Sequence, residues 1–208
     1  MSDRVRHQEN SLTLSPELGG FVEITPACGV ALDLRYATTN NFLGRCIGGA
    51  LTRLFLHPIA ADKLRRAIDL LGAERPDRQL VIFDGLRPNN VQRVLWDAVD
   101  GTAQEPYVAD PAVGSIHSYG LAVDVSLLDA DGQEIDMGTP FDDFSPLAEP
   151  QLEDAHLTSG RLSRAQIDNR RLLRRVMVTA GFQVLPNEWW HFDALPPEEV
   201  RARFVRVE

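Results

Sequence analysis

The sequence is short of cysteine, of basic charge and of long apolar runs. Its 208 residues include two cysteines, 21 Lys and Arg, and 30 Asp and Glu, so the formal net charge is -9. Because nucleic-acid binding draws on clustered basic charge, this deficit argues against an RNA or DNA partner. No stretch approaches the roughly 18 apolar residues that a membrane span requires. We therefore expect a protein that binds neither nucleic acid nor membrane.

The two cysteines, Cys28 and Cys46, are too few for a disulfide framework and lack the spacing of a metal-binding pair. We expect both to be buried free thiols. The first twenty residues lack the apolar core of a secretory signal, which favours a cytoplasmic location and an N-terminal arm over residues 1–20. The remainder, residues 21–208, is the right length for one domain.

Apolar periodicity and turn residues predict an α+β domain with a mostly antiparallel central sheet flanked by helices. Strands are expected at 21–25, 31–37, 80–83 and 121–127, with a terminal hairpin at 182–185 and 189–193. Helices are expected at 57–72, at 88–98, from a capping box at Ser163 and Gln166 to a stop at Gly181, and at 196–204. The Asp-, Gly- and Pro-rich segment 129–162 is expected to be a loop covering a functional site.

Three helical faces follow from the same periodicity. The first helix should bury Ile59, Leu64, Ala67, Ile68 and Leu71, and the second Val91, Val94, Leu95 and Ala98. In the third, RRLLRR at 170–175 predicts a solvated basic face around Leu172, Leu173, Val176 and Met177.

The stretch GSIHSYGLAVDVSL, residues 114–127, places a carboxylate inside an apolar strand. In a strand, Val123 and Val125 face one side while Asp124 faces the other. A buried carboxylate without a partner is costly, so we expect a cation beside it. His117 precedes the strand, and Gly120 lets the turn fold tightly toward Asp124.

NEWWHFD, residues 187–193, supplies a third ligand in His191. Two histidines and an aspartate are a ligand set that suits catalytic zinc, which keeps one position open for water and lowers its pKa to about 7. Glu188 would accept the proton of that water. Because residues three apart on a flat strand point to opposite faces, we predict a bend or bulge at Trp189 and Trp190.

FDGLRP, residues 83–88, projects Arg87 from the end of a buried strand. Pro88 restricts Arg87 to extended geometry, so its guanidinium is held at a rigid point. A fixed cation near a bound carbonyl would stabilise the developing oxyanion, an effect of about 3 to 4 kcal/mol in comparable sites.

Each of these residue types also has a purely structural interpretation. His7, His57 and His156 are expected to be surface or satisfied core residues. Asp84 is interpreted as a turn residue before Gly85, and the two tryptophans at 189 and 190 as core aromatics.

SIHSYGLAVDVSL resembles the S-x-H-x-x-G-x-A-x-D signature of zinc D-alanyl-D-alanine dipeptidases, the VanX-like family, and EWWHF resembles their second motif. DLRYATTNNFLG, FDGLRP and MGTPFDDFS resemble further segments of the family in the same order, so the similarity runs from about residue 21 to 193. It implies a hydrolase of the metalloprotease type, with a fold shared with zinc D,D-carboxypeptidases of the peptidoglycan and with Hedgehog domains.

The resemblance also implies roles for individual residues. His117, Asp124 and His191 match the ligands of one Zn²⁺ per chain, Glu188 matches the catalytic base, and Arg87 matches the arginine that stabilises the tetrahedral intermediate.

Two further positions, Ser115 and Asp142, fall in segments that resemble substrate-binding parts of the family, with Asp142 a candidate for binding the dipeptide ammonium. The implied substrate is free D-Ala-D-Ala in the cytoplasm. A roof formed by 129–162 would admit a dipeptide and exclude peptidoglycan strands.

Other functions stay open at this point. A more open groove would give a D,D-carboxypeptidase or endopeptidase acting on murein, and a zinc-stabilised binding domain would need no catalysis. The sequence leaves open the oligomeric state, a homodimer included. It also leaves open whether the purpose is vancomycin resistance or alanine recovery in cell wall metabolism.

Overall fold

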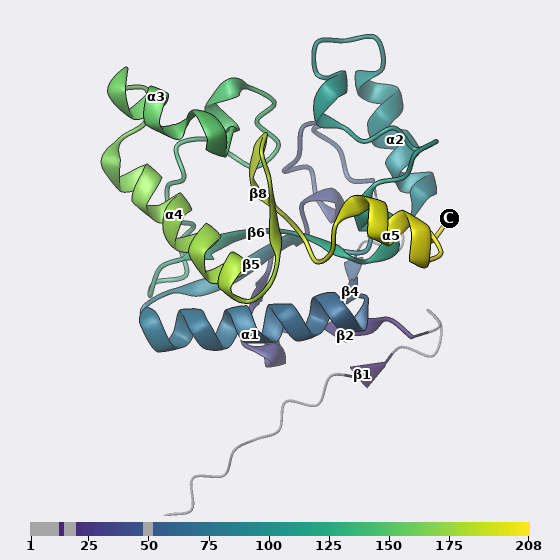
Figure 1. The fold of residues 1–208 in the computed structure, drawn as a ribbon, viewed down its shortest axis with the longest axis horizontal. Helices are drawn as coiled ribbons and strands as arrows, with labels where there is room; N and C mark the ends of the chain where they lie inside the picture. Colours follow the sequence, from purple (N-terminus) through teal and green to yellow (C-terminus); the bar gives the residue numbers. More distant parts are fainter. Residues whose placement is uncertain (1–12, 15–19, 48–51) are drawn as a thin grey trace, which may run out of the picture.

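The chain folds into two β-sheets with helices packed on them (Figure 1). The computed structural model describes residues 13–14, 20–47 and 52–208. The larger sheet has the order β3-β5-β6-β8-β7, formed by β3 Ala31–Leu32, β5 Gln79–Asp84, β6 Ala122–Leu128, β7 Gln183–Leu185 and β8 Glu188–Asp193. Its neighbouring strands are antiparallel except β3 and β5, which confirms the predicted α+β fold with a mostly antiparallel sheet.

A smaller antiparallel sheet has the order β1-β2-β4, formed by β1 Thr13–Leu14, β2 Val22–Ile24 and β4 Leu54–Leu56. The strand predicted at 21–25 is β2. The sequence patterns do not predict β4, because three apolar residues are too few to show an alternation. Most of the predicted arm, 1–12 and 15–19, lies outside the described residues.

Five α-helices occur in the described part of the chain: α1 Pro58–Glu74, α2 Asn89–Val99, α3 Glu153–Thr158, α4 Arg164–Thr179 and α5 Pro197–Arg203. The capping box predicted for α4 is present, since Ser163 Oγ accepts from the backbone N–H of Gln166 while Gln166 Oε1 accepts from that of Ser163. None of these helices has the length and apolar character of a membrane span.

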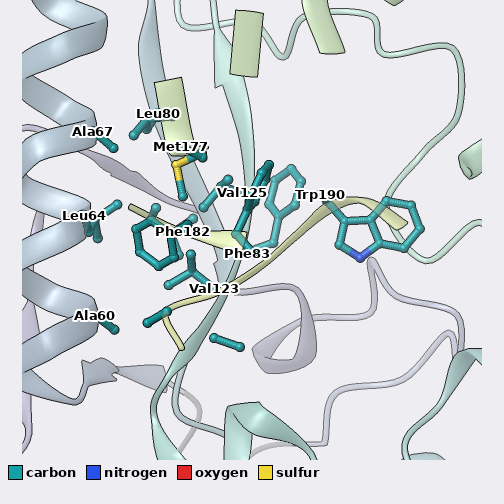
Figure 2. Close-up of a cluster of buried hydrophobic side chains, with 14 of the residues drawn as sticks. Ala60, Leu64, Ala67, Leu80, Phe83, Val123, Val125, Met177, Phe182 and Trp190 are labelled. Carbon is teal, nitrogen blue, oxygen red and sulfur yellow. The ribbon is translucent and has the colours of Figure 1, made fainter. Parts of the chain in front are cut away.

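A hydrophobic core fills the space between α1, α4 and the larger sheet (Figure 2). Its buried side chains include Ala60, Leu64 and Ala67 of α1, Leu80 of β5, Val123 and Val125 of β6, Met177 of α4, and Phe182. Because side chains alternate along a strand, directing Val123 and Val125 into this core turns Asp124 to the opposite face. The candidate site lies on that opposite face.

Two local predictions are wrong in their extent. The strand expected at 31–37 stops after Leu32, and Arg35–Ala37 forms a short 3-10 helix. On α2 the buried face includes Gln92, Leu95 and Val99, whereas Ala98 is exposed and Val91 and Val94 are half-buried. Gln92 tolerates burial because its side-chain amide donates to the carbonyl oxygen of Ala109 at 2.7 Å.

On α1 the buried face is Ala60, Ala61, Leu64, Ala67 and Leu71, so the predicted Ile59 and Ile68 lie at its half-buried edge. The helix also continues past Gly72 to Glu74. A helix needs no glycine to end, and here the backbone N–H of Arg75 still bonds to the Leu71 carbonyl.

Two predictions about surface and core are wrong. Both cysteines are free, but Cys28, at the end of a 3-10 helix at Pro26–Cys28, is half-buried at the edge of the core, and Cys46 is exposed. Arg170 of the RRLLRR segment is buried instead of solvated, because the backbone carbonyl oxygens of Met137 and Leu147 accept hydrogen bonds from its guanidinium.

The predicted loop 129–162 is partly helical. It contains α3 and two 3-10 helices, Pro146–Ala148 and Pro150–Leu152.

Candidate metal centre and active site

Three buried side chains from two distant segments meet on one face of the larger sheet. His117 lies in a 3-10 turn, Ile116–Tyr119, Asp124 lies in β6, and His191 lies directly opposite Asp124 in β8. Asp124 Oδ1 is 3.0 Å from His191 Nδ1 and 3.3 Å from His117 Nε2. The two ring nitrogens are 3.1 Å apart. The predicted ligand set is therefore brought together.

The donor atoms fit a divalent metal ion. Zinc bound tetrahedrally at about 2.0 to 2.1 Å requires ligand atoms roughly 3.3 Å apart, close to the separations found here. The outward ring nitrogen of His117, Nδ1, is 2.8 Å from the Gly85 carbonyl oxygen, and that of His191, Nε2, is 2.9 Å from Asp193 Oδ1. If each outward nitrogen carries the proton, the inward one presents a lone pair to the centre.

The charge of Asp124 is consistent with this arrangement. Burial alone would raise the pKa of its carboxyl, but the imidazoles of His117 and His191 outweigh burial and hold the pKa well below the usual range. A carboxylate that stays ionised beside two imidazoles is a suitable ligand for a cation.

The turn that carries His117 depends on Gly120. This residue has φ 63°, and a Cβ atom there would lie 2.6 Å from the Phe21 ring. The backbone N–H of His57 also donates to the Gly120 carbonyl at 2.8 Å. Glycine therefore allows both the left-handed conformation and the close packing that return the chain from His117 into β6.

Glu188 reaches the metal side of β8 through the irregularity predicted at the tryptophans. Val184 of β7 pairs with Phe192, but the next residue, Leu185, pairs with Glu188, so residues 189–191 of β8 have no partner in β7. Glu188 Oε2 consequently lies 3.9 Å from His191 Nδ1. Burial raises the pKa of Glu188 to about 8, against the opposing effect of the His191 imidazole.

Arg87 lies three residues after the end of β5 and lines the same cavity. Its Nε is 3.3 Å from Asp84 Oδ2, and its guanidinium carbon lies 5.1 Å from the centroid of the Tyr36 ring. Asp84 is thus part of the site, and its interpretation as a turn residue is wrong. Asp84 Oδ2 also lies 3.6 Å from His117 Nδ1, so this carboxylate adjoins both the arginine and a ligand.

Asp142 and Ser115 both line the cavity, which has a volume of about 360 Å³. Asp142 accepts hydrogen bonds from the Tyr36 hydroxyl at 3.1 Å and the Phe42 backbone N–H at 3.4 Å. Burial, with the charge of Asp124, raises its pKa to about 7. Among the described residues Asp142 is the one non-glycine with a positive φ, 61°, a left-handed conformation that aspartate adopts more readily than most residues.

Sequence reasoning missed three residues of the site. The sequence does contain a signal for Asp193. It lies two positions after His191 in the predicted strand, and residues two apart on a strand share a face, so its carboxylate can accept a hydrogen bond from the imidazole. Asp84 stands three positions before Arg87, and Tyr36 follows a strand that ends earlier than predicted. For the last of these, no local signal indicated that the hydroxyl would reach Asp142.

The other histidines are used structurally, as expected. His156 is buried with Nε2 2.8 Å from the Pro146 carbonyl oxygen, and His57 is half-buried and caps α1. His7 lies outside the described residues. Trp189 and Trp190 are buried aromatics, and Trp190 also lines the cavity.

The buried His-Asp-His group could hold a metal ion, and Glu188 and Arg87 face the same cavity, an arrangement consistent with a hydrolase of the metallopeptidase class. The chain belongs to the family described as D-ala-D-ala dipeptidase, whose sequence model matches residues 20–208.

Curated relatives agree with this membership. The chain is 36% identical over 162 residues to the D-alanyl-D-alanine dipeptidase of Escherichia coli, covering 78% of this chain and 77% of the relative. It is 31% identical over 184 residues to the enzyme of the same name from Enterococcus faecalis, covering 80% and 87%. The Enterococcus faecium enzyme is 29% identical over 184 residues, with 79% and 85% covered.

Proposed function

We propose that the protein is a zinc-dependent dipeptidase that hydrolyses D-alanyl-D-alanine, or a similar dipeptide with a D residue, to free amino acids. The observation that carries this proposal is the convergence of His117, Asp124 and His191 at 3.0 to 3.3 Å with Glu188 beside them. The names of the curated relatives support the choice of substrate.

His117 Nε2, Asp124 Oδ1 and His191 Nδ1 would hold one Zn²⁺ per chain. When bound, Zn²⁺ polarises the scissile carbonyl and lowers the pKa of a water to about 7. Gly85 and Asp193 keep the two imidazoles oriented by accepting their outward N–H groups at 2.8 and 2.9 Å.

Glu188 acts as the general base and then as the acid. Its carboxylate takes the proton of the attacking water and passes it to the leaving amine. Arg87 donates to the oxygen that becomes negative as the carbonyl carbon turns tetrahedral. Its pairing with Asp84 fixes the guanidinium before substrate arrives.

Asp142 and Ser115 would recognise the ends of the dipeptide. The carboxylate of Asp142, anchored by Tyr36, is suited to the substrate ammonium, and the Ser115 hydroxyl offers a donor in the wall of the same cavity. A site that must satisfy buried polar groups with both substrate termini rejects longer peptides strongly, because a missing partner leaves a buried charge unpaired.

The proposed setting is the cytoplasm, in cell wall metabolism, where the substrate would be free D-alanyl-D-alanine. Vancomycin resistance and recovery of alanine from wall turnover are both compatible with this chemistry. Neither a nucleic acid nor a membrane belongs to the proposal, and a homodimer is compatible with it. Cell fractionation and growth of a deletion strain on vancomycin would separate these roles.

The proposal is tested by incubating zinc-loaded protein with D,D-, L,D- and L,L-dipeptides and with a murein pentapeptide, and measuring free amino acid. We expect release from D-Ala-D-Ala and little from the pentapeptide. Glu188→Gln should keep the zinc and lose turnover by on the order of 10²- to 10⁴-fold. Glu74→Gln, at the exposed end of α1, is the matched control and should behave as the parent. Pentapeptide cleavage above dipeptide cleavage would replace the proposal with a D,D-carboxypeptidase.

A further inference from the structure

Arg170 is a buried cation outside the cavity whose position neither the ligand set nor the proposed chemistry explains. It is the first residue of RRLLRR in α4 and is only 1% exposed. Its Nε donates to the Met137 carbonyl at 2.6 Å, Nη1 donates to the Leu147 carbonyl at 3.0 Å, and Nη2 donates to Thr139 Oγ1 at 3.3 Å. One guanidinium therefore binds three points of a single segment.

That segment, residues 137–147, is the central part of the loop predicted at 129–162, and it carries Asp142. From here on, the name roof is used for residues 137–147 alone. Met137 and Thr139 precede Asp142 and Leu147 follows it, so Arg170 fastens both ends of the roof to α4. Asp142 itself has a left-handed backbone conformation, which a free loop would leave readily. Fastening the chain on both sides holds the carboxylate in the cavity.

The same contacts reach the strand that bears Glu188. Thr139 Oγ1, bound by Arg170, also accepts a hydrogen bond from Trp189 Nε1 at 2.8 Å. The Arg170 guanidinium lies 5.7 Å from the centroid of the Trp189 ring. Trp189 follows Glu188 immediately and lies in the part of β8 that has no partner in β7. The chain of contacts Arg170, Thr139, Trp189 therefore ends beside the proposed base.

We propose that Arg170 is a positioning residue for the reaction, which through Thr139 sets both the roof carrying Asp142 and the bulged end of β8 carrying Glu188. This inference rests on the proposed function. It assigns to α4, which supplies no residue to the cavity lining, the task of aligning the substrate-binding carboxylate with the base. Misplacement of a reacting group by about 1 Å can cost on the order of 10²-fold in rate.

The task requires the shape of arginine as well as its charge. Three acceptors in different directions match the planar fork of a guanidinium, whereas a lysine ammonium is a point charge that would leave part of the set unbound. Glu153, with Oε1 4.0 Å from Arg170 Nη1, supplies the buried counter-charge and is itself paired with Arg174. Arg170→Lys therefore keeps the charge balance while removing the fork.

Two variants and one control test the proposal in the zinc-loaded, full-length protein. Arg170→Lys removes the fork, and Thr139→Val removes the shared acceptor without touching the arginine. Arg171→Lys, at the partly exposed neighbour that is paired with Asp154, is the control. For each we measure kcat and KM for D-Ala-D-Ala, zinc content, and amide hydrogen exchange of peptides spanning 137–147 and 183–193.

We expect Arg170→Lys to lower kcat/KM by about 10- to 100-fold, with kcat falling because Glu188 shifts and KM rising because Asp142 shifts. Exchange should accelerate in both peptides while zinc content stays at one per chain. Thr139→Val should lower kcat by about tenfold with faster exchange in 183–193. Arg171→Lys should stay within about twofold of the parent throughout.

Parental kinetic constants in folded Arg170→Lys would overturn the proposal, and so would a loss of activity that only follows the folded fraction. If Arg170→Lys does not fold, Thr139→Val decides by the same criteria. If the parent protein hydrolyses no dipeptide, the proposed function is wrong. The two failures remain distinguishable, since the exchange measurements report whether Arg170 fastens the two segments even without activity.

Discussion

The floor and the roof of the cavity are held by different kinds of bonds. The floor comprises β5, β6 and β8 with the turn Ile116–Tyr119, and antiparallel ladders fix it through backbone hydrogen bonds. The roof, residues 137–147, contains neither a strand nor an α-helix, and it is fastened by Arg170 of α4 and by Trp189. This difference in bonding corresponds to how accurately each part must place its functional atoms.

A metal ion requires its ligand atoms to be placed to within a few tenths of an ångström. Direct pairing of Asp124 with His191 across two strands fixes the positions of these two ligands, and Asp193 orients the His191 imidazole. Recognition of a substrate requires a surface shaped to one ligand, and an irregular segment can provide that shape. Such a segment has no strand ladder to hold it, so side-chain hydrogen bonds such as those of Arg170 must fix its position. The comparison predicts that changes in the floor act on the metal, while changes in the roof act on substrate and rate.

The largest effect is expected from His117→Ala in the floor. Loss of one of three ligands should remove the zinc and lower turnover by on the order of 10³-fold or more. Zinc content by mass spectrometry and D-Ala-D-Ala hydrolysis are the measurements. His57→Asn is the control, since asparagine retains an N-cap acceptor for α1 and the histidine lies outside the ligand set. Full zinc content in His117→Ala would contradict the ligand assignment.

A smaller effect is expected from Asp193→Asn, which changes the orienting partner of His191 and no ligand. Loss of the carboxylate that accepts the Nε2 proton at 2.9 Å should weaken zinc affinity by about 10- to 100-fold. Competition with a chelator measures the affinity directly. Unchanged affinity would mean that the β6–β8 ladder alone orients the imidazole, which would sharpen the contrast between the two parts further.

The floor could be predicted from the sequence because its information is local. LAVDVSL alternates, so it assigns Asp124 to the face opposite Val123 and Val125. In β6 the two valines belong to the core and Asp124 lines the cavity. The need for a bulge between Glu188 and His191 also followed from strand geometry alone and is met in the pairing of β7 with β8. Where a property depends on period and spacing, one sequence is enough.

The roof could not be predicted in the same way, because its structure depends on partners distant in sequence. RRLLRR reads as a solvated basic stripe, and nothing within it indicates that carbonyl oxygens of Met137 and Leu147 would surround Arg170. The contact between Tyr36 and Asp142 joins residues 106 positions apart. Burial of polar groups is decided by such tertiary partners, and binary patterning does not contain them.

Asp142→Asn tests the substrate side of the comparison through pH. Since burial raises the pKa of Asp142 to about 7, its carboxylate forms as pH rises through 7, and KM for the dipeptide should fall over that interval. Above a pKa of about 8 the substrate amine loses its charge, so KM should rise again. In Asp142→Asn the low-pH limb should disappear and KM should rise roughly tenfold at pH 7.5, with zinc content unchanged. A low-pH limb that persists in the variant would assign it to another group.

The smallest effect is expected from Ser163→Ala, which weakens α4 without touching its contacts to the roof. Removing the Oγ that caps the helix should cost about 1 kcal/mol of unfolding free energy, because the Gln166 N–H loses its acceptor. For a chain of this length that corresponds to a fall in Tm of about 2 to 4 °C. Ser163 is exposed and lies two turns before Arg170, so kcat and KM should stay at parental values below the transition. Comparison with Arg170→Lys then separates helix stability from alignment: if Ser163→Ala lowered kcat as much as Arg170→Lys does, any weakening of α4 would suffice, and the specific fastening of the roof would lose its support.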